Sequence, residues 1–374
     1  MGKIAIVFGT RPEAIKMAPV VKAFQAADWE TTVIVTGQHR EMLDQVLELF
    51  GIIPDHDLNI MRPGQSLSEM TAAVLTGLDQ ILRDSPVDYL LVHGDTTSAV
   101  AAALAGFYHQ IPVAHVEAGL RTGNLAHPFP EEANRRLIDQ VSSLFFAPTQ
   151  TAAANLLHEG VPAEKVYVTG NTVVDALRMM VEPDYQFTMT ELSRLNFSRP
   201  VVVITAHRRE NWGQPLNNIC SAIGEAAASL PVEFVFAMHR NPQIQAVVKQ
   251  HLSGFSNVHL IDSCGYKDFI NLLNRCSFIV TDSGGLQEEA AALAKPVIVL
   301  REFTERPEGI ASGFIRLVGT DPDRIVDGIY KLATDRELYV QMTQGENPYG
   351  DGQAAVRIKN IIQQQFNRQK NKPE

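Results

Sequence analysis

The strongest constraint on the fold of this chain is an alternation of short apolar runs with longer helical segments. Apolar, β-rich runs in the first half are separated mostly by helical segments such as Pro12–Ala26 and Thr97–Tyr108. These runs are Ile4–Phe8, Thr32–Thr36, Tyr89–Val92, Val113–Val116, Leu144–Ala147 and Val166–Val168. Strands that alternate with helices in this way are typical of βαβ units, which build a parallel sheet. The pattern therefore predicts the α/β class.

The same alternation restarts in the second half, after a predicted helix at Thr172–Met180 and a polar, proline-bearing stretch at Val181–Pro200. The strands predicted there are Val201–Thr205, Glu233–Ala237, Val258–Ile261, Phe278–Thr281, Pro296–Leu300 and Ile315–Val318. We therefore expect two doubly wound, Rossmann-like domains, 1–170 and 171–352. Such domains usually face each other across a cleft and bind ligands beyond the carboxyl ends of their strands. A last helix, Gln353–Phe366, follows a glycine-rich break, and residues 367–374 are expected to fray.

Composition narrows the class of protein further. The chain has 374 residues, of which 45% are hydrophobic, so it is long enough for two separate cores. A net charge of -10 argues against a nucleic-acid surface. Cys220, Cys264 and Cys276 form no C-x-x-C pair and the histidines lack metal spacing, so we expect no metal and a reduced, cytoplasmic setting. We recognise neither a secretory leader nor a membrane-length apolar stretch, and we expect no membrane partner.

Charged residues gather where the first predicted strand ends. Arg11 and Lys16 lie at the start of the following helix, where an anion is the natural partner. The alternative for Arg11 is a surface ion pair with Glu13. Because Pro12 and Glu13 occupy the turn where a dinucleotide fold needs glycine, and because no Walker-type motif occurs, we expect no nicotinamide or flavin cofactor.

Carboxylates mark two further strand ends and one helix start. Asp95 and Glu117 follow consecutive strands, and Glu131 follows a proline-bearing loop. In a partly desolvated cleft, such carboxyl groups can differ enough in pKa to serve as general acid and general base. The alternative for Asp95 and Glu131 is helix capping. A purely structural Glu117 would instead need a buried partner such as Arg121 or Arg135.

The second half carries a glycine turn, Asp282-Ser283-Gly284-Gly285, between a buried strand and an acidic helix. Backbone N–H groups at such a helix start are unpaired, and they predict an anion cradle. Glu288 or Glu289 lies one turn further, where a carboxylate can accept hydrogen bonds from ribose hydroxyls. The alternative is an ordinary helix that Ser283 caps.

Two more charged strand ends in this half are suited to a phosphate group. His207 and two arginines follow one strand, and a diphosphate bound there would explain all three charges. Arg306 lies in a later charged loop and is suited to the same ligand. The alternative for His207 is a hydrogen-bonded structural residue.

These motifs together resemble a known family over almost the whole chain. The ordered set is GTRPEAIKMAP (9–19), TGQHREMLDQVL (36–47), HGDTTS (93–98), HVEAGLRT (115–122), PEEANR (130–135), TAHRREN (205–211), DSGGLQEE (282–289) and TERPE (304–308). It closely resembles the non-hydrolysing UDP-N-acetylglucosamine 2-epimerases. The resemblance implies a two-domain fold of the glycosyltransferase-B type, a homodimer, and a last helix, 353–374, that packs back on the first domain. It also implies interconversion of UDP-N-acetylglucosamine (UDP-GlcNAc) and UDP-N-acetylmannosamine (UDP-ManNAc) for bacterial surface polysaccharides.

The chemistry of the sugar constrains the mechanism. The proton on carbon 2 has no neighbouring carbonyl to acidify it, and no nicotinamide is expected that could oxidise carbon 3. Expulsion of UDP from carbon 1 supplies the activation and leads to 2-acetamidoglucal, to which UDP then adds back. The predicted acid/base set is Asp95, Glu117 and Glu131, without assignment to a face of the sugar. His207, Arg11 and Lys16 would stabilise the departing diphosphate.

The remaining predicted contacts belong to the nucleotide. They are Ser283, Gly284, Gly285, Glu289, Arg306 and Phe269. Phe269 matches the family's uracil-packing position, and a core aromatic residue is its alternative reading.

Regulation and exact substrate stay open at this stage. Some members of the family bind a second UDP-GlcNAc as an activator through a Gln-His-Arg segment and an Arg-Gln pair. Gln38-His39-Arg40 is present here, but 62–65 lacks an arginine directly before Gln65. The competing functions are a 2-epimerase for a UDP-2,3-diacetamido uronic acid, a retaining UDP-sugar glycosyltransferase and a nucleotide-sugar sensor.

Overall fold

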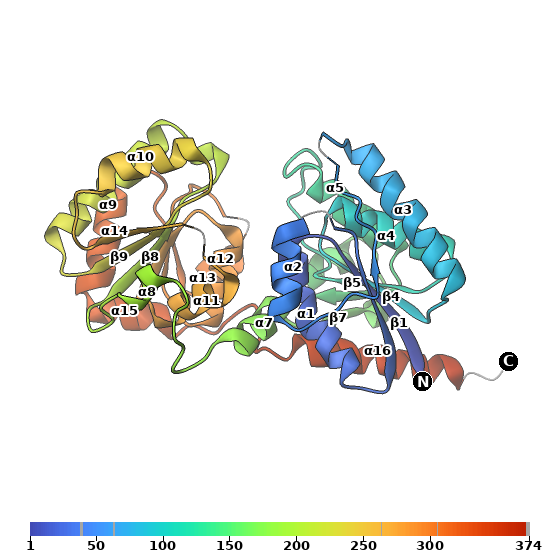
Figure 1. Ribbon diagram of the computed structural model, residues 1–374. Helices are drawn as coiled ribbons and strands as arrows, with labels where there is room; N and C mark the ends of the chain where they lie inside the picture. The colour runs from blue at the N-terminus through green and yellow to red at the C-terminus, as the bar shows by residue number, and fades with distance from the viewer. Residues whose placement is uncertain (38–39, 63, 263, 305, 372–374) are drawn as a thin grey trace. The chain divides into compact units, whose positions relative to one another are not determined.

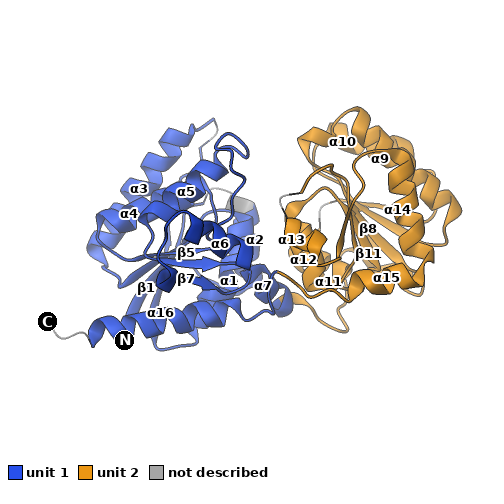
Figure 2. Ribbon diagram, turned by 180° about the vertical axis from the view of Figure 1, so that it is seen from behind, with its two compact units in different colours: residues 1–179, 349–374 blue, residues 180–348 orange. Residues whose placement is uncertain are grey.

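A computed structural model describes residues 1–37, 40–62, 64–262, 264–304 and 306–371 (Figure 1). The chain forms two compact units (Figure 2). Unit 1 comprises Met1–Met179 together with Tyr349–Glu374, and unit 2 comprises Met180–Pro348.

Unit 1 is built on a parallel sheet with the strand order β3-β2-β1-β4-β5-β6-β7. Its strands are β1 (Gly2–Phe8), β2 (Trp29–Val35), β3 (His56–Asp57), β4 (Tyr89–His93), β5 (Val113–Val116), β6 (Leu144–Ala147) and β7 (Val166–Val168). The chain builds outward from β1 in one direction and then resumes at β4 on the other side of β1. This reversal between β1 and β4 is a topological switch point, where ligands of open α/β sheets bind.

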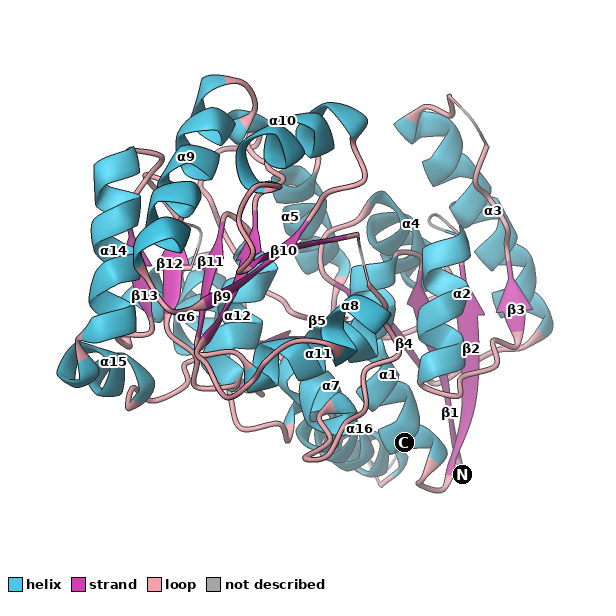
Figure 3. Cartoon of the chain, turned by 60° about the vertical axis from the view of Figure 1, so that its left-hand side comes forward, coloured by secondary structure: helices cyan, strands magenta, loops and turns pink. Residues whose placement is uncertain are grey.

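Helices cover both faces of this sheet (Figure 3). They are α1 (Arg11–Gln25), α2 (Arg40–Leu49), α3 (Leu67–Asp84), α4 (Thr97–Tyr108), α5 (Glu131–Val141), α6 (Gln150–His158), α7 (Thr172–Met180) and α16 (Ala354–Lys370). Alanine-rich α4 is buried along most of its length and packs against α3 and α5. The C-terminal helix α16 lies along α1 (Figure 1).

Unit 2 repeats the design with the strand order β10-β9-β8-β11-β12-β13, again all parallel. Its strands are β8 (Val201–Thr205), β9 (Glu233–Ala237), β10 (Val258–Ile261), β11 (Phe278–Thr281), β12 (Val297–Val299) and β13 (Ile315–Leu317). Its helices are α8 (Thr190–Ser193), α9 (Gln214–Ser229), α10 (Pro242–Leu252), α11 (Tyr266–Arg275), α12 (Gly284–Ala292), α13 (Pro307–Ala311), α14 (Pro322–Thr334) and α15 (Arg336–Thr343). The switch point of this sheet lies between β8 and β11.

The predicted α/β class with two doubly wound domains is confirmed, because each predicted strand overlaps a strand of one of the two parallel sheets. The edge strand β3 was not predicted, since it has only two residues, His56 and Asp57, and both are polar. The last helix was predicted to end at Phe366, and it continues to Lys370. Residues 372–374 of that predicted segment lie outside the described residues.

The two units divide after Met179, whereas the sequence suggested a division after residue 170. Most of α7 therefore belongs to unit 1. The reason is Asp175 on α7, whose carboxylate accepts hydrogen bonds from the backbone N–H groups of Ala354 and Ala355 at the start of α16. In the part of the chain that the structure describes, no helix is both long and apolar enough to cross a membrane.

Candidate active site

A pocket of ≈ 440 Å³ lies at the switch point of the unit 1 sheet. We call it the carboxylate pocket, because the predicted acid/base residues Asp95, Glu117 and Glu131 all line it. Its other lining residues are Thr10, Pro12, Glu13, Lys16, Leu67, His93, Gly94, Thr96, Thr97, Pro130 and Asn134. The lining comes from the segments after β1, β4 and β5 and from the start of α5, since the carboxyl ends of parallel strands meet at one edge of a sheet.

Glu117 is held by partners from distant parts of unit 1. Its carboxylate pairs with Lys16, which is 101 residues away in the sequence, and accepts a hydrogen bond of 2.8 Å from Asn171 Nδ2. His93 Nε2 lies 3.8 Å from the same carboxylate. The backbone φ of Glu117 is +66°, a left-handed conformation that is uncommon for a glutamate, and strained backbone of this kind clusters at functional sites.

The expected structural partners of Glu117 are engaged elsewhere. Arg121 pairs with Asp139 and Glu159, and Arg135 NH2 lies 2.5 Å from Asp95 Oδ2. Lys16, which was predicted to contact the diphosphate, takes the place of those arginines at Glu117.

Asp95 lies between a cation and two other carboxyl groups. Burial raises its pKa, the guanidinium of Arg135 opposes this shift, and the charges of Glu117 and Glu131 add to it. Asn134 Nδ2 also donates to the Asp95 carbonyl oxygen. A carboxyl group that keeps a proton more readily than usual, beside other carboxylates, is suited to acid/base catalysis.

Neither Asp95 nor Glu131 caps a helix, which was the alternative reading of both. Thr96 is the cap of α4 and accepts a hydrogen bond from Ala99 N. Helix α5 begins at Glu131 after Pro130 and has no side-chain cap.

His93 is a pocket residue that the sequence analysis did not single out. Its side chain is 4% exposed, and neither ring nitrogen has a hydrogen-bond partner among the described residues. Burial lowers the pKa of His93 to about 4, so its ring is neutral at neutral pH. Asn171 was missed as well. For both residues the only signal is a polar residue at a strand end, His93 closing β4 and Asn171 following β7.

The turn after β1 does not offer its backbone N–H groups to an anion. The buried carboxylate of Glu13 accepts hydrogen bonds from Gly9 N and Thr10 N, and it also accepts one from the Thr96 hydroxyl. Arg11 is half-buried, and within the described part of the chain it forms no ion pair with Glu13. The predicted anion site can therefore use the Arg11 side chain, but it cannot use the backbone N–H groups of Gly9 and Thr10.

In unit 2, the glycine turn leads into α12 as predicted, and Gly284 and Gly285 are the first two residues of this helix. Ser283 caps this helix by accepting a hydrogen bond from Leu286 N, so the alternative reading of Ser283 as a cap holds. Among the described contacts, no hydrogen bond reaches the backbone N–H of Gly284 or Gly285. A Cβ atom built on Gly285 would meet no atom within 4 Å, so this end of α12 is open.

His207 follows β8, and it lies across the switch point from the glycine turn. Its side chain is 41% exposed, and its ring is stacked with the ring of His239, with 6.2 Å between the ring centroids. Partial desolvation lowers the pKa of His207, and Asp282 opposes that shift. Asp282 was noted in the sequence only as part of its motif, yet its buried carboxylate anchors the turn that carries His207.

The other predicted nucleotide contacts of unit 2 are only partly accessible. Arg306 pairs with the buried carboxylate of Glu288. Glu289 is partly buried on α12. Phe269, in the first turn of α11, is also partly buried and is not among the fully buried core residues of the described chain.

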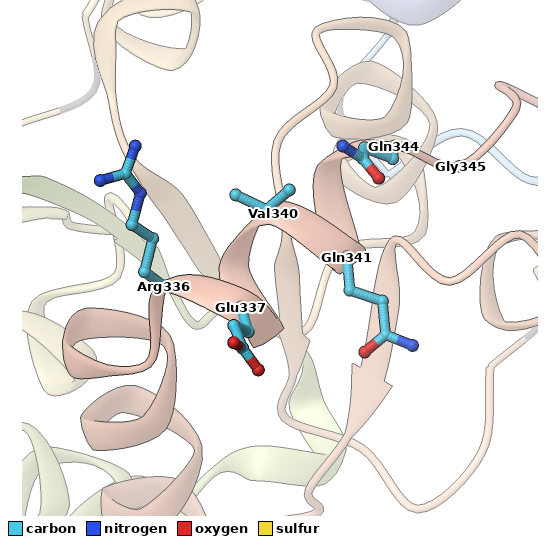
Figure 4. Close-up of a pocket in the computed structure, with 6 residues that line it drawn as sticks. All are labelled: Arg336, Glu337, Val340, Gln341, Gln344 and Gly345. Carbon is cyan, nitrogen blue, oxygen red and sulfur yellow. The ribbon is translucent and has the colours of Figure 1, made fainter.

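Two further pockets lie away from these groups. One, of ≈ 690 Å³, is lined partly by Arg62, Gly64 and Gln65 beside α3. Gln38 and His39 of the motif considered for activation lie outside the described residues. The other, of ≈ 820 Å³, lies along α15 and contains none of the predicted site residues (Figure 4). No group of three or more histidine, cysteine, aspartate or glutamate side chains in the described part of the chain could hold a metal ion.

Comparison with known proteins identifies the family. A sequence model described as UDP-N-acetylglucosamine 2-epimerase matches residues 22–363. The UDP-N-acetylglucosamine 2-epimerase of Yersinia pestis is 51% identical over 364 residues, which cover 95% of this chain and 97% of that protein.

Solved structures agree with this match. The Neisseria meningitidis UDP-GlcNAc 2-epimerase bound to UDP-GlcNAc has a TM-score of 0.87 at 47% identity, covering 97% of this chain and 100% of that chain. The Methanocaldococcus jannaschii enzyme in complex with UDP-GlcNAc and UDP has a TM-score of 0.77 at 32% identity, covering 97% and 99%. With its two parallel sheets, the protein is an enzyme of the glycosyltransferase-B-like α/β class. It belongs to the UDP-N-acetylglucosamine 2-epimerase family, and the predicted family is confirmed.

Proposed function

We propose that this protein interconverts UDP-GlcNAc and UDP-ManNAc by eliminating and re-adding UDP. The observation that carries the proposal is the convergence of Asp95, Glu117 and Glu131 on one pocket at a sheet switch point. A reaction that removes a proton from one face of carbon 2 and returns it to the other needs at least two such groups.

The elimination proceeds as follows. One carboxylate removes the proton from carbon 2, the electrons of that C–H bond form the double bond between carbons 1 and 2, and the bond from carbon 1 to the UDP oxygen breaks. In the re-addition, a protonated carboxyl group delivers a proton to the opposite face of carbon 2, and a UDP oxygen bonds to carbon 1. The raised pKa of Asp95 suits a group that holds a proton during this sequence.

The groups of unit 2 hold the nucleotide in this proposal. Gly284 and Gly285 supply backbone N–H donors to a phosphate, and His207 contacts the diphosphate. Arg11, Lys16 and Arg306 add positive charge, while Glu289 and Phe269 contact ribose and uracil. Lys16 pairs with Glu117, and Arg306 pairs with Glu288. Each cation would therefore have to contact both its carboxylate partner and the substrate.

The biological setting is also proposed. The product would feed bacterial surface polysaccharide synthesis, and the protein would act as a cytoplasmic homodimer. Among the described residues, no disulfide joins Cys220, Cys264 or Cys276, which supports a reducing compartment. Light scattering of the purified protein tests the dimer.

Incubation with UDP-GlcNAc in deuterated water tests the reaction. The expected result is UDP-ManNAc with deuterium at carbon 2. A second substrate sample, labelled with ¹⁸O in the bond between carbon 1 and phosphorus, tests elimination, because released UDP scrambles the label among its β-phosphate oxygens. Absence of both UDP-ManNAc and deuterium would contradict epimerisation, and deuterium exchange without ¹⁸O scrambling would contradict expulsion of UDP.

A further inference from the structure

Asp282 lies fully buried beneath the turn that carries His207. Its Oδ2 atom accepts three hydrogen bonds, each of 2.9 Å, from His207 N, Arg208 N and Asn211 Nδ2. Three donors on one oxygen fix which way the carboxylate faces, because rotating it would leave all three without their acceptor.

The second oxygen of this carboxylate has a different environment. Asp282 Oδ1 is buried and has no hydrogen-bond partner among the described residues, and it lies 3.3 Å from His207 Nδ1. A buried, unsatisfied carboxylate oxygen is costly and needs an explanation. A proton on His207 Nδ1 would satisfy it after a small adjustment of the ring.

We propose that Asp282 is a positioning residue that keeps the proton of neutral His207 on Nδ1 and so presents Nε2 to the diphosphate of UDP. The inference rests on the proposed function where it names the diphosphate, whereas the location of the proton follows from the contacts of Asp282. Asp282 does not touch the substrate in this proposal, and it acts only through His207.

The pairing explains how His207 can carry a charge when it is needed. The groups that face its ring are Asp282, His239 and Arg208. Desolvation lowers the pKa of His207, Asp282 opposes this shift, and the charges of His239 and Arg208 add to it. The free protein therefore keeps this ring neutral at neutral pH. When a diphosphate binds, its charge favours uptake of a proton from water at Nε2, and the resulting imidazolium already has its Nδ1–H aimed at a carboxylate. As the bond to carbon 1 breaks, the hydrogen bond from Nε2–H to the phosphate strengthens.

Asp282→Asn is the sharpest variant, because the three donors decide how the new amide must lie. Its carbonyl oxygen has to replace Oδ2, which leaves the amide nitrogen facing His207 Nδ1. That nitrogen donates, so His207 must leave Nδ1 bare and carry its proton on Nε2 instead. Asp282→Asn keeps the hydrogen bonds that anchor the turn and leaves His207 Nε2–H as a donor toward the phosphate. Its amide N–H group faces Nδ1, however, so it disfavours the doubly protonated, charged form of the ring.

¹⁵N nuclear magnetic resonance of histidine-labelled protein, at a pH where His207 is neutral, reads the location of the proton directly. The protein has 11 histidines, and the spectrum of His207→Asn assigns the signal. We expect Nδ1–H in the wild type and Nε2–H in Asp282→Asn. Asn211→Ala is the matched control, since it removes one hydrogen bond to Oδ2 and leaves the atom facing Nδ1 unchanged, so its His207 should stay Nδ1–H. Nε2–H in the wild type, or the same tautomer in Asp282→Asn, would overturn the proposal.

Kinetics give an independent readout. In Asp282→Asn we expect kcat to fall about 10²-fold or more, with a small change in KM, because the charged form of His207 is lost and a neutral donor stays. A rise in KM with an unchanged kcat would contradict the proposal. If Asp282→Asn does not fold, the wild-type spectrum alone decides. A wild type with Nδ1–H that does not turn over UDP-GlcNAc would contradict the proposed function and leave the pairing of Asp282 with His207 intact.

Discussion

Glu13 and Glu69 occupy the same position in two capping boxes, yet their electrostatics are opposite. Each accepts a hydrogen bond from the backbone N–H of its cap, Thr10 in one helix and Ser66 in the other. Burial raises the pKa of Glu13 in spite of its hydrogen bonds. Hydrogen bonds from Ser66 lower the pKa of exposed Glu69. The position within the motif is therefore not sufficient to set the direction of the pKa shift, and burial decides it.

Glu13→Gln and Glu69→Gln should change the pH dependence of stability in opposite directions. Between the ordinary pKa of 4.5 and its raised value, folded Glu13 binds a proton that the unfolded chain has lost, so its contribution to stability disappears as pH rises through the folded pKa. The contribution of Glu69 is present above 4.5 and is lost as pH falls through the folded pKa. Neither glutamine side chain titrates, so each variant removes the contribution of its glutamate across the acidic range.

Denaturant unfolding of the wild type and both variants across the acidic range tests this pair. The free energy of unfolding of the wild type minus that of Glu13→Gln should fall as pH rises. The free energy of unfolding of the wild type minus that of Glu69→Gln should instead increase. Slopes of the same sign would show that Glu13 is not the buried, reluctantly ionised group that its environment indicates.

The sequence predicted which residues would gather in unit 1 but not how they would pair. Asp95 and Glu117 could be anticipated because strand ends of a parallel sheet converge. The pairing of Lys16 with Glu117 spans 101 residues and depends on the register of the sheet, which no local pattern encodes. In the same way, nothing near Arg306 in the sequence indicates that it pairs with Glu288.

At the level of elements, α16 depends on a cap from another helix. Gln353 at its start makes no side-chain cap, and Asp175 on α7 accepts from the first two N–H groups of α16 instead. Sequence reading could not find this cap, because capping rules look only within a few residues of the helix start. Strands, in contrast, were found from their apolar runs, and within the described part of the chain the short polar strand β3 is the one that was not predicted.

Asp175→Ala should therefore destabilise unit 1 by about 1–2 kcal/mol, the usual cost of a lost N-cap. The loss should concentrate in α16, so hydrogen exchange of its amides should accelerate more than that of α3. Asp28→Ala is the control, because Asp28 is exposed and no contact of its carboxylate is described, and it should stay within about 0.5 kcal/mol of wild type. Unchanged protection of α16 in Asp175→Ala would contradict the assigned cap.

Helix α12 allows a test of the anion cradle that leaves the fold intact. A methyl group at Gly285 meets no protein atom, and alanine is a better helix former than glycine, so Gly285→Ala should fold with equal or slightly higher stability. The same methyl group would stand where a phosphate must approach the backbone, so the Kd for UDP should rise about tenfold or more. Calorimetric titration with UDP measures this.

Gly254→Ala provides the matched comparison, since its Cβ also meets open space and Gly254 is not among the predicted site residues. It should bind UDP like the wild type. If Gly285→Ala also binds UDP with unchanged affinity, the glycine turn is only a capped helix start, as its alternative reading holds.

Across the whole molecule, one topological rule accounts for both groups of predicted site residues. In unit 1 the switch point between β1 and β4 is flanked by Lys16 and Asp95, and in unit 2 the switch point between β8 and β11 is flanked by His207 and the glycine turn. The repeated alternation of strands and helices was enough to predict two sheets. It could not give their strand orders, so which strand ends would be neighbours became known only from the structure.

The proposed division of labour makes unit 1 responsible for proton transfer and the glycine turn of unit 2 responsible for UDP. Asp95→Asn and Glu117→Gln should therefore lower turnover by about 10²–10⁴-fold or more while the Kd for UDP changes less than about tenfold. Asp88→Asn is the control for Asp95→Asn, because Asp88 lies just before β4 and its carboxylate accepts a hydrogen bond from Lys3 N, at the opposite end of the same strand. It should turn over substrate like the wild type. Deuterium exchange at carbon 2 and calorimetry with UDP separate the two effects in each variant. A carboxylate variant that loses UDP binding together with turnover would make Asp95 or Glu117 structural, whereas one that keeps both would remove it from the acid/base set.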